Sequence, residues 1–125
     1  MPGVSRDRIA QIDDWGVVED RHEDVEGTTI SFLTIREDVD AGPLLRGLPG
    51  DRCSSPHWGY VFAGSLTFSF EGHEETYSAG EAFHVPAGHG MAATPGTEYL
   101  QFSPAEELRH VSETMVRNMQ ALQQA

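Results

Sequence analysis

The sequence contains no lysine, and all eight of its basic residues are arginine. Without lysine the chain cannot form a Schiff base, and it lacks the lysine of a phosphate-binding loop, which excludes pyridoxal-phosphate chemistry and P-loop nucleotide hydrolysis. Positive charge is scarce as well, because 20 acidic residues against 8 basic ones give a formal net charge of -12. This charge repels phosphate backbones and anionic lipid headgroups, so we expect neither nucleic acid nor a membrane as partner.

Cysteine and long hydrophobic runs are also scarce. The single cysteine, Cys53, cannot form an internal disulfide, and no charged N-terminus leads into an apolar run of signal-peptide length. We therefore expect a cytoplasmic protein. The longest apolar stretches, such as residues 60–63, are far shorter than the roughly 20 residues that a membrane span needs.

The 125 residues have the size and composition of one globular domain with three regions. Residues 1–26 are charged and polar, and we expect an N-terminal extension with a short helix and an edge strand. Residues 27–102 read as short strands separated by Gly, Pro and Asp turns, which favours a β-sandwich or barrel. Within them, residues 65–70 alternate strictly between apolar and hydroxyl side chains, and residues 71–74 form a hairpin-type turn.

Residues 103–125 have the period of an amphipathic helix. Ser103, Pro104 and Glu106 have the spacing of a capping box at its start. We expect the apolar stripe to pack on the outside of the barrel, with a dimer contact as the alternative; it consists of Leu108, Val111, Met115, Val116, Met119 and Leu122.

Two segments carry a resemblance to a known family. Residues 60–66 (YVFAGSL) look like the end of the first cupin motif, and residues 80–88 (GEAFHVPAG) look like the start of the second. The resemblance covers roughly residues 28–102. It implies an all-β fold, a single antiparallel cupin barrel of the jelly-roll type, with the C-terminal helix packed on it. Small cupins frequently pair, so we expect a homodimer.

Cupins usually hold one divalent metal with three histidines and one glutamate. By the commoner spacing, the first two histidines fall on Asp51 and Cys53, the glutamate falls on His57, and the third histidine falls on Met91. The sequence therefore departs from the family pattern at every ligand position, and a standard cupin metal site cannot simply be carried over.

Substitute ligands are nevertheless present: Cys53, His57, His84 and His89. Such a set could hold zinc with one position open, and imidazole also suits iron, nickel and copper. His84 can take part only if it faces inward, opposite to Phe83 and Val85. The alternative is that no metal binds and that the histidines are hydrogen-bonded residues of an apolar pocket. A role of Cys53 as a nucleophile activated by His57 is a weaker hypothesis than metal binding.

We expect the barrel to bind a small molecule. The candidate pocket-lining residues are Trp58, Tyr60, Phe68, Phe83, Met91 and Tyr99. His22, His73 and His110 are interpreted as surface residues, and the acidic residues between positions 19 and 26 as a solvated face, because they lack EF-hand spacing. Arg46 or Arg52 could pair with a ligand carboxylate. The alternative function is a metal-dependent enzyme of the oxygenase, isomerase or lyase class that acts on a small oxygen-bearing substrate.

Overall fold

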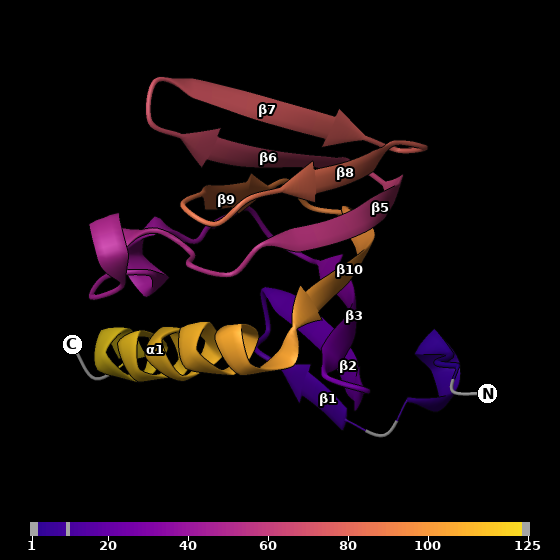
Figure 1. The fold of residues 1–125 in the computed structure, drawn as a ribbon. Helices are drawn as coiled ribbons and strands as arrows, with labels where there is room; N and C mark the ends of the chain where they lie inside the picture. Colours follow the sequence, from indigo (N-terminus) through magenta and orange to yellow (C-terminus); the bar gives the residue numbers. More distant parts are fainter. Residues whose placement is uncertain (1–2, 10, 124–125) are drawn as a thin grey trace.

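The structure is a computed structural model that describes residues 3–9 and 11–123. Two antiparallel sheets face each other, and one helix follows the last strand (Figure 1). The six-stranded sheet has the order β1 (Gln11–Asp14), β2 (Val18–Val25), β3 (Thr28–Ile35), β10 (Glu98–Pro104), β5 (His57–Ala63) and β8 (Ala82–Val85). The four-stranded sheet has the order β4 (Val39–Asp40), β9 (Gly90–Ala93), β6 (Ser65–Phe70) and β7 (His73–Ser78).

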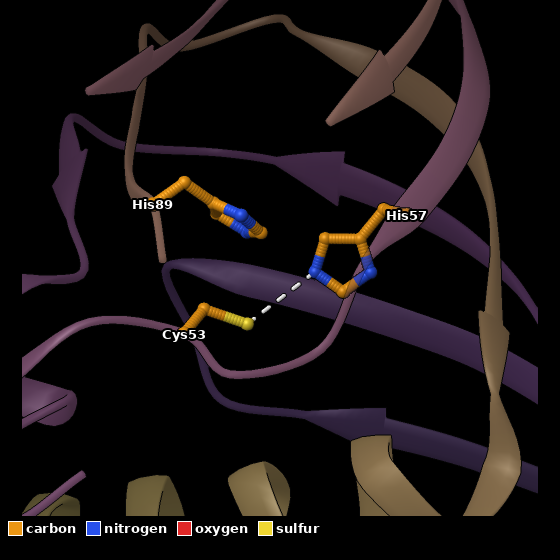
Figure 2. Close-up of side chains that lie close together, drawn as sticks. All are labelled: Cys53, His57 and His89. Atoms are coloured by element: carbon orange, nitrogen blue, oxygen red, sulfur yellow. Dashed lines mark hydrogen bonds between the residues drawn. The ribbon is translucent and has the colours of Figure 1, made fainter. Parts of the chain in front are cut away.

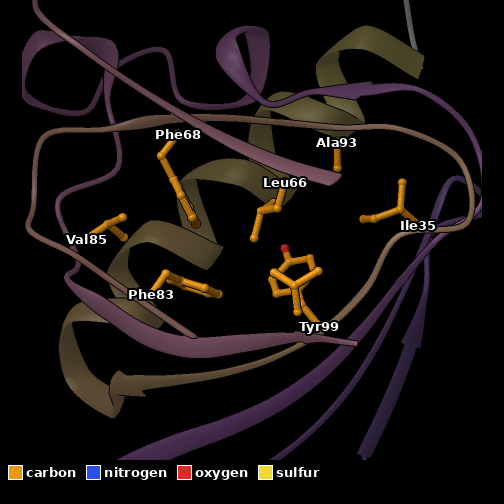
Figure 3. Close-up of a cluster of buried hydrophobic side chains, with 8 residues drawn as sticks. Ile35, Leu66, Phe68, Phe83, Val85, Ala93 and Tyr99 are labelled. Atoms are coloured by element: carbon orange, nitrogen blue, oxygen red, sulfur yellow. The ribbon is translucent and has the colours of Figure 1, made fainter. Parts of the chain in front are cut away.

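The core lies between the two sheets, where alternate side chains of each strand meet. In β6 the expected alternation is observed, since Leu66 and Phe68 are 0% and 1% exposed while Ser65 and Thr67 are only half-buried. Figure 3 shows side chains from both sheets converging in this cluster, whose buried members are Ile35, Val61, Leu66, Phe68, Phe83, Val85, Ala93 and Tyr99. The expected turn between β6 and β7 is also present, with Gly72 at a φ of 87°.

The N-terminal region is part of the barrel rather than an extension of it. β2 pairs with β3 along its whole length, from Val18 opposite Ile35 to Val25 opposite Thr28. β1 is the expected edge strand, and the expected short helix is a single 3-10 turn, η1 (Arg6–Arg8). The boundary predicted at residue 26 therefore does not separate an N-terminal extension from the barrel. It falls in the turn of the β2–β3 hairpin, and β2 is a strand of the six-stranded sheet.

The helix α1 (Ala105–Gln123) begins two residues later than predicted, and residues 124–125 of the predicted helix lie outside the described residues. Ser103 does not cap it, because Ser103 belongs to β10 and its hydroxyl is engaged in the barrel. None of the helices in the described part of the chain combines the length and apolar character that crossing a membrane requires.

The position of α1 also differs from the expectation that it packs on the outside. Val111 of α1 is 1% exposed and packs with Ala41, Leu45, Leu48 and Cys53. The helix thus covers inward-facing side chains at the open side of the barrel. The loop turn η2 (Gly42–Leu44) contacts the helix, and a second turn, η3 (Pro49–Asp51), follows in the same loop. Within the predicted apolar stripe only Val111 is buried; Leu108, Met115, Val116 and Met119 are half-buried, and Leu122 is 54% exposed.

Candidate functional site

Three of the four predicted ligand residues converge in the barrel interior. Cys53, His57 and His89 each offer a ligand atom, and these atoms all lie within 4.8 Å of one another. Figure 2 shows the three side chains pointing toward one another from separate stretches of chain. His57 is the first residue of β5, and His89 directly precedes β9. The backbone N–H of Cys53 donates to the carbonyl oxygen of His89 at 2.8 Å, which holds the two loops together.

Hydrogen bonds orient each ring of the cluster. The Nδ1 of His89 donates to the carbonyl oxygen of Pro86 at 2.8 Å, so the Nε2 of the neutral ring is free of a proton. His57 Nδ1 lies 2.7 Å from Ser103 Oγ, and its Nε2 lies 3.5 Å from Cys53 Sγ. The Nε2 of His89 is therefore available as a ligand, and the Nε2 of His57 is available in the tautomer whose Nδ1 donates to Ser103 Oγ. The cysteine sulfur lies beside His57 Nε2.

Burial keeps the cluster neutral. Cys53, His57 and His89 are 6%, 4% and 1% exposed. Burial lowers the pKa of His57 to about 3, with a smaller contribution from His89, and burial also lowers the pKa of His89. Burial raises the pKa of the Cys53 thiol to about 11, against a smaller opposing effect of the Ser55 backbone. A thiol with a raised pKa is a poor nucleophile, which argues against the nucleophile reading of Cys53.

The donor set fits a borderline-soft divalent metal. Tetrahedral zinc with Zn–S near 2.3 Å and Zn–N near 2.0 Å places sulfur and nitrogen about 3.5 Å apart. The observed separation of Cys53 Sγ and His57 Nε2 is 3.5 Å. With two imidazoles and a thiolate, zinc would have one open position and would supply Lewis acidity there. Loss of the thiol proton would accompany its binding.

His84, the fourth predicted ligand, lies on the other face of the sheet. Phe83 and Val85 are buried in the core at 5% and 0% exposure, so strand alternation directs His84 outward. Its ring stacks on Trp58 with centroids 4.8 Å apart. His84 is therefore separated from the other three candidate ligands by the sheet itself.

The predicted pocket-lining residues are divided among three environments. Phe68, Phe83 and Tyr99 are packed in the core, and burial raises the pKa of the Tyr99 hydroxyl. Trp58 and Tyr60 are 46% and 39% exposed on the outer face, because β5 directs His57, Gly59 and Val61 inward. The sixth residue, Met91, is half-buried and lines the cavity described next.

A cavity of about 330 Å³ lies between α1 and the inward face of β1, β2 and β3. Its wall is mainly apolar. Those apolar side chains include Val18, Leu33, Val39, Leu44, Met91, Leu108, Met115, Val116 and Met119. Four titratable side chains from β1 and β2 form its polar wall: Asp13, Asp20, His22 and Asp24. An apolar cavity with a few convergent polar groups is the usual form of a small-molecule site.

The polar wall corrects two expectations, since neither His22 nor the whole acidic run is a solvated surface. In β2, Asp20, His22 and Asp24 lie opposite Leu33, Ser31 and Thr29, which face inward. The period of two at positions 18, 20, 22 and 24 is the signal that places them on one face. Because three of these four positions carry Asp or His, the strand lacks the apolar alternation by which a half-buried strand is recognised in a sequence. His73 and His110 are exposed, as expected.

The groups of the polar wall have different partners. His22 Nε2 lies 2.8 Å from Asp13 Oδ2, and the Thr29 hydroxyl donates to Asp24 Oδ1 at 2.6 Å. Asp20 Oδ1 is shielded from solvent and has no hydrogen-bond partner among residues 3–9 and 11–123. Burial raises the pKa of Asp20 to about 6; nearby His22 opposes the increase and Asp13 adds to it.

The two arginines that could have met a ligand carboxylate lie elsewhere. Arg46 is exposed beside η2, and the Arg52 guanidinium donates to the carbonyl oxygen of Gly88 at 3.3 Å. Neither residue lines the cavity, whose arginine is Arg109 of α1.

Comparison with known proteins supports the fold. No protein-family model and no curated protein matches the chain significantly. Among solved structures, the polyketide cyclase RemF from Streptomyces resistomycificus is 15% identical with a TM-score of 0.57, over 83% of this chain and 79% of that chain. An RmlC-like cupin from Shewanella frigidimarina is 17% identical with a TM-score of 0.56, over 81% and 88%.

A Rhizobium leguminosarum protein of unknown function is 14% identical with a TM-score of 0.58, over 82% of this chain and 94% of that chain. Together with the two-sheet topology, these similarities show that the chain has the cupin fold. The all-β jelly-roll barrel predicted from the sequence is confirmed.

Proposed function

We propose that the protein binds a small organic molecule in the cavity between α1 and β1, β2 and β3. The cavity itself carries the proposal, because its volume of about 330 Å³ lies in the range of small-molecule sites. At roughly 30 Å³ for each water-sized group, it would hold a ligand of about ten non-hydrogen atoms. The apolar wall would supply most of the affinity, and the polar wall would orient the ligand.

The test is a fragment screen by ligand-observed NMR on the wild type and two variants. Leu108→Trp places a large ring in the cavity, whereas Leu122→Trp makes the same change where the side chain is 54% exposed on the same helix. Fragments of about ten non-hydrogen atoms should bind the wild type and Leu122→Trp, and binding should be lost in Leu108→Trp. An absence of binding to the wild type, or binding that survives Leu108→Trp, would refute the proposal.

We also propose that Cys53, His57 and His89 hold a divalent transition metal, with zinc favoured over iron, nickel or copper. The sulfur–nitrogen spacing of 3.5 Å and the His89–Pro86 hydrogen bond support this assignment. It is the basis for the second candidate function, a metal-dependent enzyme of the oxygenase, isomerase or lyase class. A cytoplasmic location, which we propose with it, would keep Cys53 reduced.

Binding is favoured over catalysis because the cluster and the cavity are separate. Cys53, His57 and His89 are at most 6% exposed, and none of them lines the cavity. A metal on these residues would therefore be shielded from the cavity ligand and would stabilise the barrel.

Elemental analysis of tag-free protein, followed by Co²⁺ titration of the metal-free form, tests the metal site. His57→Gln and His89→Gln should lose the metal, whereas His84→Ala, a change on the outer face, should retain about one equivalent. Co²⁺ should produce thiolate charge-transfer absorption that Cys53→Ser abolishes. A folded wild type that takes up neither zinc nor cobalt would overturn the metal site and leave the small-molecule proposal standing.

A further inference from the structure

We propose that the ligand of the cavity is a small organic amine whose ammonium group pairs with Asp20 while its apolar body lies against Leu33 and α1. This inference rests on the proposed function, since it names the chemical class of the molecule that the cavity would bind. It depends on three observations: which charged groups line the cavity, which of them already have partners, and what covers the rest of the wall.

The cavity wall is richer in negative than in positive charge. Asp13 comes from β1, Asp20, His22 and Asp24 come from β2, and Arg109 comes from α1. Arg109 is an exposed residue, whereas Asp20 and His22 are half-buried. A carboxylate ligand would have to lie beside three aspartates, which disfavours organic anions.

Among the three carboxylates of this wall, Asp20 is the one without a hydrogen-bond or ion-pair partner in the described part of the chain. Asp13 is paired with His22, and Asp24 accepts the Thr29 hydroxyl. Asp20 Oδ1 is shielded from solvent without a hydrogen-bond partner in the described part of the chain. A buried carboxylate is costly unless it is paired, and an ammonium group is the ligand group that would offset this cost.

The rest of the cavity wall is mainly apolar and, among the described residues, adds no further carboxylate that a ligand would have to pair with. In the six-stranded sheet Leu33 lies directly opposite Asp20, so an apolar surface begins next to the carboxylate. Leu108, Met115 and Met119 of α1 continue this surface across the cavity. A ligand with one cationic end and a compact apolar body matches this division. Flexible methionine side chains would let the wall adapt to bodies of different shape.

The pairing predicts how amine binding depends on pH. Burial raises the pKa of Asp20 to about 6, and an ammonium partner favours its ionised form. Amine affinity should therefore fall as the pH drops below about 6. His22, Asp13, Asp24 and Arg109 also line this cavity; the carboxylates of Asp13 and Asp24 would favour a cation, and Arg109 would oppose one.

Three probes with the same cyclohexyl ring test the ligand class: cyclohexylmethylamine, cyclohexylmethanol and cyclohexanecarboxylate, titrated at pH 7.5 and followed by amide chemical shifts. The wild type should bind the amine at least about tenfold more tightly than the alcohol, and the carboxylate most weakly. Asp20→Asn should reduce the preference for amine over alcohol to about twofold or less. Glu23→Gln removes an exposed acid from the same strand and should leave the preference intact.

The outcomes separate the two proposals. Equal binding of amine and alcohol to the wild type would overturn the amine class and leave a general small-molecule site. A preference that persists in Asp20→Asn would overturn the role of Asp20. If none of the three probes binds the wild type, but other fragments bind it and do not bind Leu108→Trp, the amine inference fails and the proposed function stands. If no fragment binds the wild type either, both proposals fail.

Discussion

Ser103 Oγ lies 2.7 Å from His57 Nδ1, although 46 residues separate the two in the chain. β10 and β5 are neighbours in the six-stranded sheet, and both side chains face the barrel interior. The contact sets the orientation of the His57 ring, so that its Nε2 is directed at Cys53. Ser103 is thus a positioning residue of the cluster and not a cap of α1.

Ser103→Ala should lower the free energy of unfolding by about 1–3 kcal/mol, because it leaves the buried Nδ1 of His57 without a partner. If the cluster holds a metal, the affinity should fall by roughly 10- to 100-fold through misorientation of His57. Urea unfolding and competition with a chelator measure the two effects. Ser78→Ala, at an exposed position of β7, should change stability by less than about 0.5 kcal/mol.

Asp20→Asn should stabilise the protein above pH 6 and have little effect near pH 4. The folded protein retains a proton on Asp20 up to about pH 6, whereas the unfolded chain releases it near pH 3.8. The free energy of unfolding should therefore fall as the pH rises through this window, by about 2–3 kcal/mol more in the wild type than in the variant. Denaturant curves at pH 4, 5, 6 and 7.5 test this, and parallel pH profiles would contradict it.

Gly59→Ala should destabilise the barrel by about 3 kcal/mol or more, because a methyl group at this inward position has no space. A Cβ at Gly59 would lie 2.5 Å from Phe83 Cζ and would also collide with the carbonyl oxygen of Leu100. Thermal unfolding provides the measurement. Gly3→Ala is the matched control, since a Cβ there meets nothing within 4 Å. Similar melting temperatures for both variants would show that Phe83 moves aside.

Asn118→Ala should loosen α1 over the cavity. The Asn118 side-chain amide donates to the carbonyl oxygens of Leu44 at 2.7 Å and Arg46 at 2.9 Å, which join the helix to η2. Its loss should cost about 1–3 kcal/mol and speed amide hydrogen exchange in the second half of α1. Gln120→Ala, at an exposed position two residues further along the helix, should leave exchange unchanged.

The outer face of the six-stranded sheet predicts a homodimer. Trp58, Tyr60, Phe62 and Phe102 are 46%, 39%, 49% and 37% exposed there. At roughly 200–250 Å² for an aromatic side chain, these fractions leave about 400 Å² of ring surface open on each copy. Two such faces would bury about 800 Å² of ring surface, so neighbouring side chains would have to supply about 400 Å² more to reach the roughly 1,200 Å² of a small stable interface. With a net charge of -12, two copies would repel least where aromatic side chains meet.

Phe62→Glu should convert this dimer to a monomer, because it places a charge on both sides of the two-fold interface. Light scattering coupled to size-exclusion chromatography measures the mass. Thr76→Glu introduces the same charge at an exposed position of β7 in the other sheet and should leave the dimer intact. A wild type that is monomeric at all concentrations tested would contradict the prediction.

The strand with apolar alternation at residues 65–70 was predictable from the sequence, and β6 has the expected bounds. β2 was not recognised, because its inward positions carry Asp20, His22 and Asp24, and charged residues at a period of two resemble a solvated face. Three candidate ligands were predictable because His and Cys are few. The outward direction of His84 required knowing that Phe83 and Val85 fill the core, and the place of α1 depended on loops that have no periodic pattern.

β10 ends at Pro104 and α1 begins at Ala105, so no loop separates the strand from the helix. The N–H of Ala105 donates to the carbonyl oxygen of Gly27 at 2.9 Å, which pins the first turn to the β2–β3 hairpin. The helix, 19 residues and about 28 Å long, is therefore held near both ends, at Ala105 and at Asn118. Release of Asn118 from the carbonyl oxygens of Leu44 and Arg46 would free the far half of the helix beside Met119. Asn118, which does not line the cavity, would then influence the rate of ligand exchange.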